Sequence, residues 1–188
     1  MVAVPEIRTL IERGAARRQV LEGLIESVPD DYWDRQDSGD DWTALDHLRH
    51  VATVDQMLVQ LVEAAQDPTK ELWAGDTSDE AVLEARRVEL MDKVREQSVE
   101  TLVETMRESR ARAVGTVLGM LVETLDREVR VAGALNEWGE QQAFPLRAYL
   151  AVWVEHDGEH EAAIRRAIAT PPDVTTLTLA ARRARGSR

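Results

Sequence analysis

The sequence predicts an all-α protein, a four-helix bundle with a long crossover between its second and third helices. Apolar residues recur at helical spacing in four long segments of the chain. No segment shows a strong strand period, and the only β-like runs, 129–135 and 175–179, are short. The connection between the second and third long segments covers 67–97, which fits a bundle with one long crossover.

The first two predicted helices cover 5–28 and 44–66. Pro5 suits the first turn of a helix. Arg17 and Arg18 interrupt the apolar stripe of the first helix, and we expect both to face solvent. A capping box, Thr43 as N-cap with Asp46 three residues later, predicts the start of the second helix.

The crossover and the second half of the bundle follow. Thr77 and Glu80 form a capping-box pattern, so the sequence predicts a weakly amphipathic helix over 78–95. A stronger apolar stripe predicts a helix over 98–125. Residues 126–144 contain glycines and an asparagine, and we interpret them as an irregular return loop.

The last predicted helix begins at Pro145, ends near Ala169, and is followed by Pro171 and Pro172. We therefore expect one bundle domain over 1–170. The last residues, 171–188, carry four arginines, and we expect them to be a basic, disordered tail. A nucleic-acid or membrane tether is the alternative for this tail.

Composition restricts the partners of the protein. The chain has 188 residues, 23 Lys and Arg against 35 Asp and Glu, and a formal net charge of −12. Such a charge argues against general nucleic-acid binding and favours cations over anions. The chain has no cysteine, so a thiol can take part in its chemistry only as a substrate. Without a signal-peptide pattern or an apolar run long enough to span a membrane, we expect a cytoplasmic protein.

All four histidines of the chain fall in two helical segments. His156 and His160 are one turn apart on the apolar face of the last helix, so their imidazoles converge. His47 and His50 lie in the second helix, where His47 is nearer the middle of the apolar stripe. This distribution predicts one buried site.

A histidine pair at this spacing, completed by a third histidine from a facing helix, is typical of a catalytic metal site with an open position. Neutral imidazole suits zinc, nickel, iron and copper. The alternative is a set of core histidines that only form hydrogen bonds. Left unpaired in the core, each imidazole would cost about 1–3 kcal/mol.

The residues around these histidines resemble the DinB-like superfamily. The segment 42–51, Trp-Thr-Ala-Leu-Asp-His-Leu-Arg-His-Val, is similar to the superfamily's Trp-Ser-x-x-Glu-x-x-x-His-Leu segment, with Thr43 in place of Ser and Asp46 in place of Glu. His156 and His160 match its His-x-x-x-His motif. The resemblance implies an up-down-down-up bundle, a homodimer, and a divalent metal on His50, His156 and His160. It thereby selects His50 over His47.

The resemblance also implies a class of activity. Superfamily members with an assigned activity are thiol-dependent transferases or isomerases that use low-molecular-weight thiols such as mycothiol or bacillithiol. The expected function is transfer of such a thiol to an electrophile, with zinc or nickel, or else iron or manganese, as the metal. A metal-dependent hydrolase acting through water, and a non-catalytic metal- or ligand-binding bundle, are the alternatives. We expect neither nucleic acid nor membrane as a partner.

Three more residues have two interpretations each. Asp157 could act as a catalytic base, as the Glu does in His-Glu-x-x-His enzymes, or lie solvated at the helix edge. Asp55 could hydrogen-bond a ligand histidine or pair with an arginine. His47 could support a ligand histidine or simply pack in the core, and the sequence favours packing.

Overall fold

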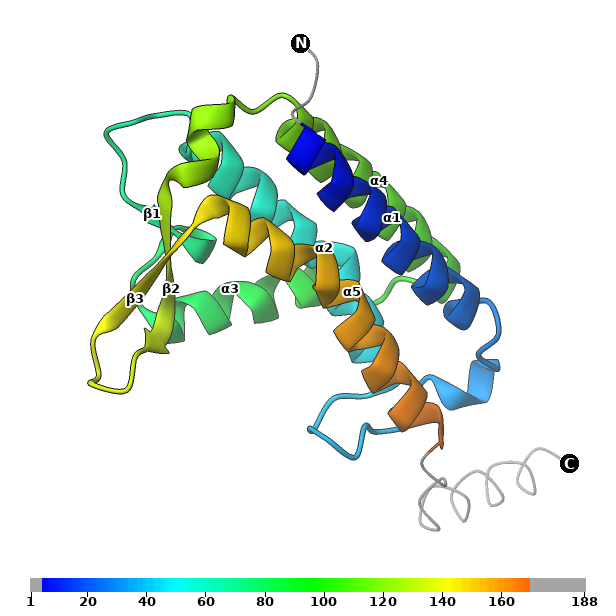
Figure 1. Ribbon diagram of the computed structural model, residues 1–188. Coiled ribbons are helices and arrows are strands. Elements are labelled where there is room, and N and C mark those ends of the chain that lie inside the picture. The colour runs from blue at the N-terminus through cyan, green and yellow to red at the C-terminus, as the bar shows by residue number, and fades with distance from the viewer. Residues whose placement is uncertain (1–4, 170–188) are drawn as a thin grey trace, which may run out of the picture.

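In the computed structural model, which describes residues 5–169, four long helices pack around a common core (Figure 1). Helix α2 packs mainly against α4, α1 packs against α5, and α2 also contacts α5. These four helices are α1 (Pro5–Ile25), α2 (Ala44–Ala64), α4 (Val99–Leu118) and α5 (Leu146–Ala169).

Side-chain contacts give the relative directions of these helices. Glu6 bonds Arg147 and Arg18 bonds Asp157, so α1 and α5 run parallel. Ser109 of α4 donates to the Ala52 carbonyl of α2, and the next residue of α4, Arg110, donates to Asp55, which is further along α2. The order of the contacts is the same in both helices, so α2 and α4 are also parallel. Because α2 and α5 run antiparallel, the middle of one faces the middle of the other.

The prediction of an all-α four-helix bundle is wrong, because the chain also forms a small mixed sheet. The crossover adds a fifth α-helix, within the segment 78–95 for which a helix was predicted. The sheet has the order β1-β2-β3, with β1 parallel to β2 and β2 antiparallel to β3. The hairpin of β2 and β3 projects beside the helices, next to α3 (Figure 1). These elements are β1 (Leu72–Trp73), α3 (Glu80–Lys93), β2 (Glu128–Leu135) and β3 (Gln141–Pro145).

The hairpin replaces the irregular loop that the sequence predicted over 126–144. Asn136 closes its turn, because the Asn136 side-chain oxygen accepts from the backbone N–H groups of Trp138 and Glu140. Gly139 has φ 79° in this turn, a conformation that suits glycine. The register shifts between Arg130 and Leu135, and this irregularity removes the simple alternation by which a strand is predicted.

Predicted helix starts met different outcomes. The capping box at α2 is confirmed, with the Thr43 hydroxyl accepting from the Asp46 N–H and the Asp46 carboxylate accepting from the Thr43 N–H. The one predicted at Thr77 is wrong, because the N-cap of α3 is Asp79, whose carboxylate accepts two backbone N–H groups. The predicted helix over 98–125 divides into α4 and the 3-10 helix η3 (Val122–Asp126).

Within residues 5–169, no helix is long and apolar enough to cross a membrane. The double proline and the arginine-rich tail over 171–188 lie outside the described residues. The homodimer and the cytoplasmic location stay predictions.

Candidate metal centre

Three histidines from two antiparallel helices meet where α2 crosses α5. The Nε2 atoms of His50 and His156 are 3.2 Å apart, and the Nε2 atoms of His156 and His160 are also 3.2 Å apart. One nitrogen from each ring lies within 4.8 Å of the other two. The structure thus brings together the three residues that the sequence predicted as metal ligands.

The two 3.2 Å spacings around His156 fit a tetrahedral divalent ion. Zinc–nitrogen bonds of about 2.0–2.1 Å place tetrahedral nitrogen ligands about 3.3 Å apart. Hydrogen bonds between the rings cannot satisfy all of these nitrogens, because a neutral imidazole nitrogen offers either one N–H or one lone pair. The Nε2 atom of His156 has two imidazole neighbours and can bond only one of them at a time. The donor set therefore fits a metal held by three neutral imidazoles.

Burial keeps these rings neutral. It lowers the pKa of His50 to about 3, with smaller contributions from the charges of His156 and Arg87. It lowers the pKa of His160 to about 2, and it lowers the pKa of His156 as well. Unprotonated imidazoles keep the lone pairs that bind a metal, so the site is ready to ligate at neutral pH.

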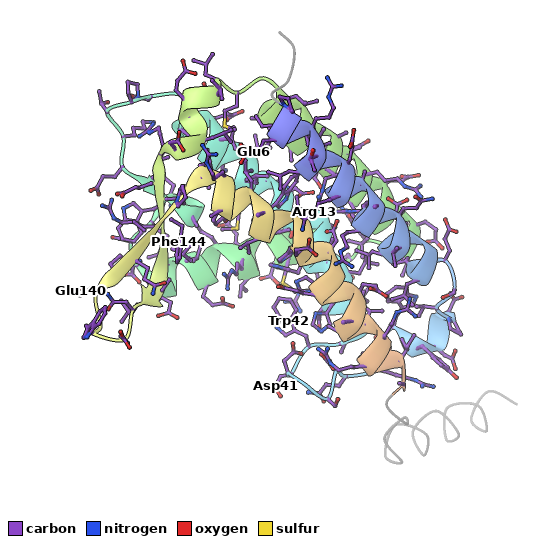
Figure 2. The ribbon with its side chains drawn as sticks, viewed as in Figure 1. Glu6, Arg13, Asp41, Trp42, Glu140 and Phe144 are labelled. Carbon is purple, nitrogen blue, oxygen red and sulfur yellow. The ribbon has the colours of Figure 1, made fainter. Side chains whose placement is uncertain are left out.

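Trp42 covers the histidines from the loop before α2. Its ring lies 5.2 Å from that of His50 and stacks on that of His160 at 6.2 Å with an interplanar angle of 19°. Figure 2 shows Trp42 in this loop, beside the C-terminal half of α5. The backbone N–H of Trp42 donates to Asp40, which fixes the loop. An indole at this position limits the access of water from that side.

His47 lies beside the three histidines but not among them. Its Nδ1 is 3.0 Å from Nδ1 of His160, which is the ring nitrogen of His160 that faces away from His156. Its Nε2 faces the carboxylates of Asp37 and Asp40 at 3.7 and 3.6 Å. The geometry places His47 in contact with a candidate ligand, the interpretation that the sequence did not favour.

A buried ionic cluster lies next to the site and corrects the prediction that Arg18 faces solvent. Arg18 is 6% exposed, and its guanidinium donates to both carboxylate oxygens of Asp157 at 2.9 and 3.0 Å. Arg110 donates to Asp55 at 2.9 Å and to Asp157 at 3.0 Å. The indole of Trp153 donates to the other oxygen of Asp55 at 2.7 Å.

This cluster decides between the two interpretations of Asp55 and tells where Asp157 lies. Asp55 pairs with arginine and does not bond a ligand histidine among the described residues. Asp157 is fully buried rather than solvated at a helix edge, and both of its oxygens are occupied by arginine. Two carboxylates face two guanidinium groups, so the charges balance, as burial requires.

An apolar cavity of about 390 Å³ opens on His50 and His156. One side is formed by α2 and α5, and the other by α3 and the β2–β3 hairpin, including Phe144 (Figure 2). Volumes of this size are typical of small-molecule sites. Sequence analysis missed this wall, because the strands that carry it had no regular alternation. The cavity leaves room for a small molecule beside His50 and His156.

Comparisons with known proteins show the fold and the family of the chain. None of the curated proteins compared with the chain matches it. A solved structure titled as a histidine-to-alanine mutant of the mycothiol-dependent maleylpyruvate isomerase superposes with a TM-score of 0.63 at 16% identity, covering 86% of this chain and 61% of its own. The present chain therefore spans less than two thirds of that protein.

A second solved structure, of an uncharacterized protein from Clostridium difficile 630, superposes with a TM-score of 0.57 at 14% identity. The superposition covers 86% of the present chain and 90% of the chain of that protein. At such identities these two structures establish a shared fold. The DinB superfamily matches residues 14–164, which is most of the chain. The chain belongs to the DinB superfamily.

Proposed function

We propose that this protein is a metal-dependent enzyme that transfers a low-molecular-weight thiol to an electrophilic substrate. The observation that carries the proposal is the convergence of three histidine Nε2 atoms at the end of an apolar cavity. His50, His156 and His160 would hold one divalent ion. The solved mycothiol-dependent isomerase with the same fold supports a thiol as the second substrate.

When bound, the ion would supply positive charge that lowers the pKa of a thiol and so raises its thiolate fraction at neutral pH. The remaining contributions come from the chain. The neutral imidazoles keep their lone pairs for the ion because burial disfavours their protonation. Trp42 and the apolar cavity exclude water that would compete with the thiol.

The balanced reaction has two parts. The thiol loses its proton to solvent, and the sulfur then forms a bond to an electrophilic carbon. A leaving group departs with the electron pair of the broken bond, or, at a carbon–carbon double bond, the pair moves to the neighbouring carbon and takes up a proton. No general base is needed in the cavity for a thiol that has already ionised.

For Asp157 we propose a positioning role in place of the catalytic base that the sequence suggested. Arg18 and Arg110 occupy its two oxygens, and no hydrogen bond joins it to the three histidines in residues 5–169. By fixing Asp157, the two arginines hold the turn of α5 that carries His156. With both oxygens engaged in this way, the Asp157 carboxylate does not face the histidine cluster as a free proton acceptor.

The test is a transfer assay with protein loaded with zinc or with nickel and, as a control, protein stripped with a chelator. Mycothiol, glutathione and cysteine are each paired with 1-chloro-2,4-dinitrobenzene, and thioether formation is followed by absorbance. We expect metal-dependent transfer that His156→Ala abolishes. Turnover of a p-nitrophenyl ester without thiol would instead support the hydrolase alternative. Absence of any turnover, with metal bound, would support a binding protein.

A further inference from the structure

The cavity beside the histidines has a chemical character that narrows the ligand. Its lining is almost entirely aliphatic or aromatic, and it contains no carboxylate among the described residues. The lining residues are His50, Val54, Met57, Leu58, Ala74, Leu83, Arg87, Val131, Ala134, Phe144, Ala148, Tyr149, Val152, Trp153 and His156. Such a wall contributes to the free energy of ligand binding only by removing apolar surface from water, at about 25 cal/mol per Å².

Among residues 5–169, Arg87 is the one charged side chain in this lining, because the imidazoles of His50 and His156 are neutral. Its side chain is 41% exposed, so its guanidinium lies at the mouth of the cavity rather than in its depth. Its Nη1 pairs with Glu84 at 3.1 Å, an exposed i,i+3 pair of the kind that contributes little stability. Arg87 nevertheless belongs to the lining of the cavity, together with His50 and Tyr149.

Tyr149 provides a neutral polar group on the same wall. Burial raises the pKa of its phenol, so the hydroxyl stays protonated and can donate a hydrogen bond. A cation entering this cavity would meet Arg87, whereas Glu84, the carboxylate that pairs with Arg87, is not among the lining residues. An anion would meet the only positive side chain in the lining and a phenol donor. The lining therefore favours an anion although the protein as a whole has a net charge of −12.

We propose that this cavity binds the electrophilic substrate, and that the substrate is a largely apolar molecule with one carboxylate. The apolar body would cover Val152, Ala148 and Met57, the carboxylate would pair with Arg87 at the mouth, and the reactive carbon would face His50 and His156. The role as substrate rests on the thiol transfer proposed above. Binding of the apolar acid itself is independent of that reaction.

The first test measures binding without catalysis. Octanoate, octanol and octylamine are titrated by calorimetry into metal-free protein. We expect octanoate to bind about fivefold more tightly than octanol, because a half-exposed ion pair contributes up to about 1 kcal/mol. Octylamine should bind most weakly. From hexanoate to octanoate, affinity should rise about fourfold per methylene, since each buried methylene contributes about 0.8 kcal/mol.

Two variants, each with a matched control, locate the ligand. Arg87→Gln should make octanoate and octanol bind equally, whereas Arg112→Gln, the same change at an exposed arginine of α4, should leave the preference intact. Val152→Trp should fill the cavity and abolish binding. Val152 is 63% exposed, so the larger ring need not disturb the core. Val20→Trp, at a 51% exposed valine of α1, is its control.

Several results would overturn the inference. They are equal binding of octanol and octanoate to the wild type, an unchanged preference in Arg87→Gln, and full binding by Val152→Trp. If octanoate bound only after zinc was added, the carboxylate would be a metal ligand and the assignment to Arg87 would be wrong. Failure of the thiol-transfer reaction has a different signature, because octanoate would still bind metal-free protein with the same dependence on Arg87.

Discussion

His47 and His160 approach each other through their Nδ1 atoms, at 3.0 Å, while Nε2 of His160 points to His156. If His160 binds a metal through Nε2, its proton must lie on Nδ1, and His47 is then the acceptor. His47 in turn carries its proton on Nε2, which faces Asp37 and Asp40. Such outer hydrogen bonds orient metal-bound histidines and increase their basicity.

We therefore predict that His47→Ala weakens zinc binding without abolishing it. Loss of an outer hydrogen bond to a metal ligand typically costs about 10-fold to 100-fold in affinity. Competition with a chromophoric chelator measures the dissociation constant. His47→Gln should recover part of the loss, because its amide can still accept from Nδ1 of His160. A His47→Ala protein that binds zinc as well as the wild type would show that His47 only packs.

His156→Ala should remove most of the metal. Nε2 of His156 is the nitrogen that lies 3.2 Å from both of the others, so its loss leaves two imidazoles and solvent. The measurement is metal content by elemental analysis after loading and desalting. Glu159→Gln, at an exposed position on the same helix, is the control and should load fully. Equal metal in His156→Ala and the wild type would refute the assignment of ligands.

Asp157→Asn should destabilise the protein by about 3 kcal/mol, because it leaves the buried guanidinium groups of Arg18 and Arg110 with one charge too few. Urea denaturation measures the change. Glu159→Gln removes the same charge from an exposed position and should change stability by less than about 0.5 kcal/mol. Loss of activity in Asp157→Asn at unchanged stability would instead support a catalytic base.

Stability of the metal-free protein should fall as the pH falls from about 7 to 4. The pKa values of His50, about 3, and of His160, about 2, lie below the ordinary value of about 6.5, because burial disfavours the charged ring. Below pH 6.5 the unfolded chain therefore binds more protons than the folded one. Each such histidine contributes a slope of up to about 1.4 kcal/mol per pH unit, and the stabilisation is complete above pH 6.5.

Urea midpoints at several pH values measure this slope. The double variant His50→Gln, His160→Gln should have a shallower pH dependence over the same range, whatever its absolute stability. Bound zinc should steepen the dependence in the wild type, because protons compete with the metal for the same nitrogens. A flat profile in the wild type between pH 7 and 4 would contradict the neutral, buried state of the two rings.

The sequence predicted those features of the fold and the site that depend only on residues close together in the chain. The capping box of Thr43 and Asp46 needs only four consecutive residues, and it is present in the structure. The pairing of His156 with His160 needs only one helical turn. The choice of His50 over His47 depends on the resemblance to the superfamily. Both histidines lie on the buried side of α2, and the helical wheel alone slightly favours His47.

Features that depend on distant partners could not be predicted in this way. Arg18 looks like an interruption of an apolar stripe until Asp157, 139 residues away, is placed against it. The hairpin of β2 and β3 depends on pairing with β1 and on a bulge that breaks the alternation of its residues. Arg87 has no local feature that marks it, since its position at the cavity mouth results from the packing of α3 against the hairpin.

The wall of the cavity is built from several elements, and this affects how the ligand specificity of the protein can change. The three histidines come from α2 and α5, whereas Leu83 and Arg87 come from the crossover, and Val131 and Phe144 come from the hairpin. Substitutions or insertions in the crossover and the hairpin can therefore change which ligand the cavity accepts while leaving the candidate metal centre intact. A library confined to 72–93 and 128–144 would sample new specificities on a constant chemical core.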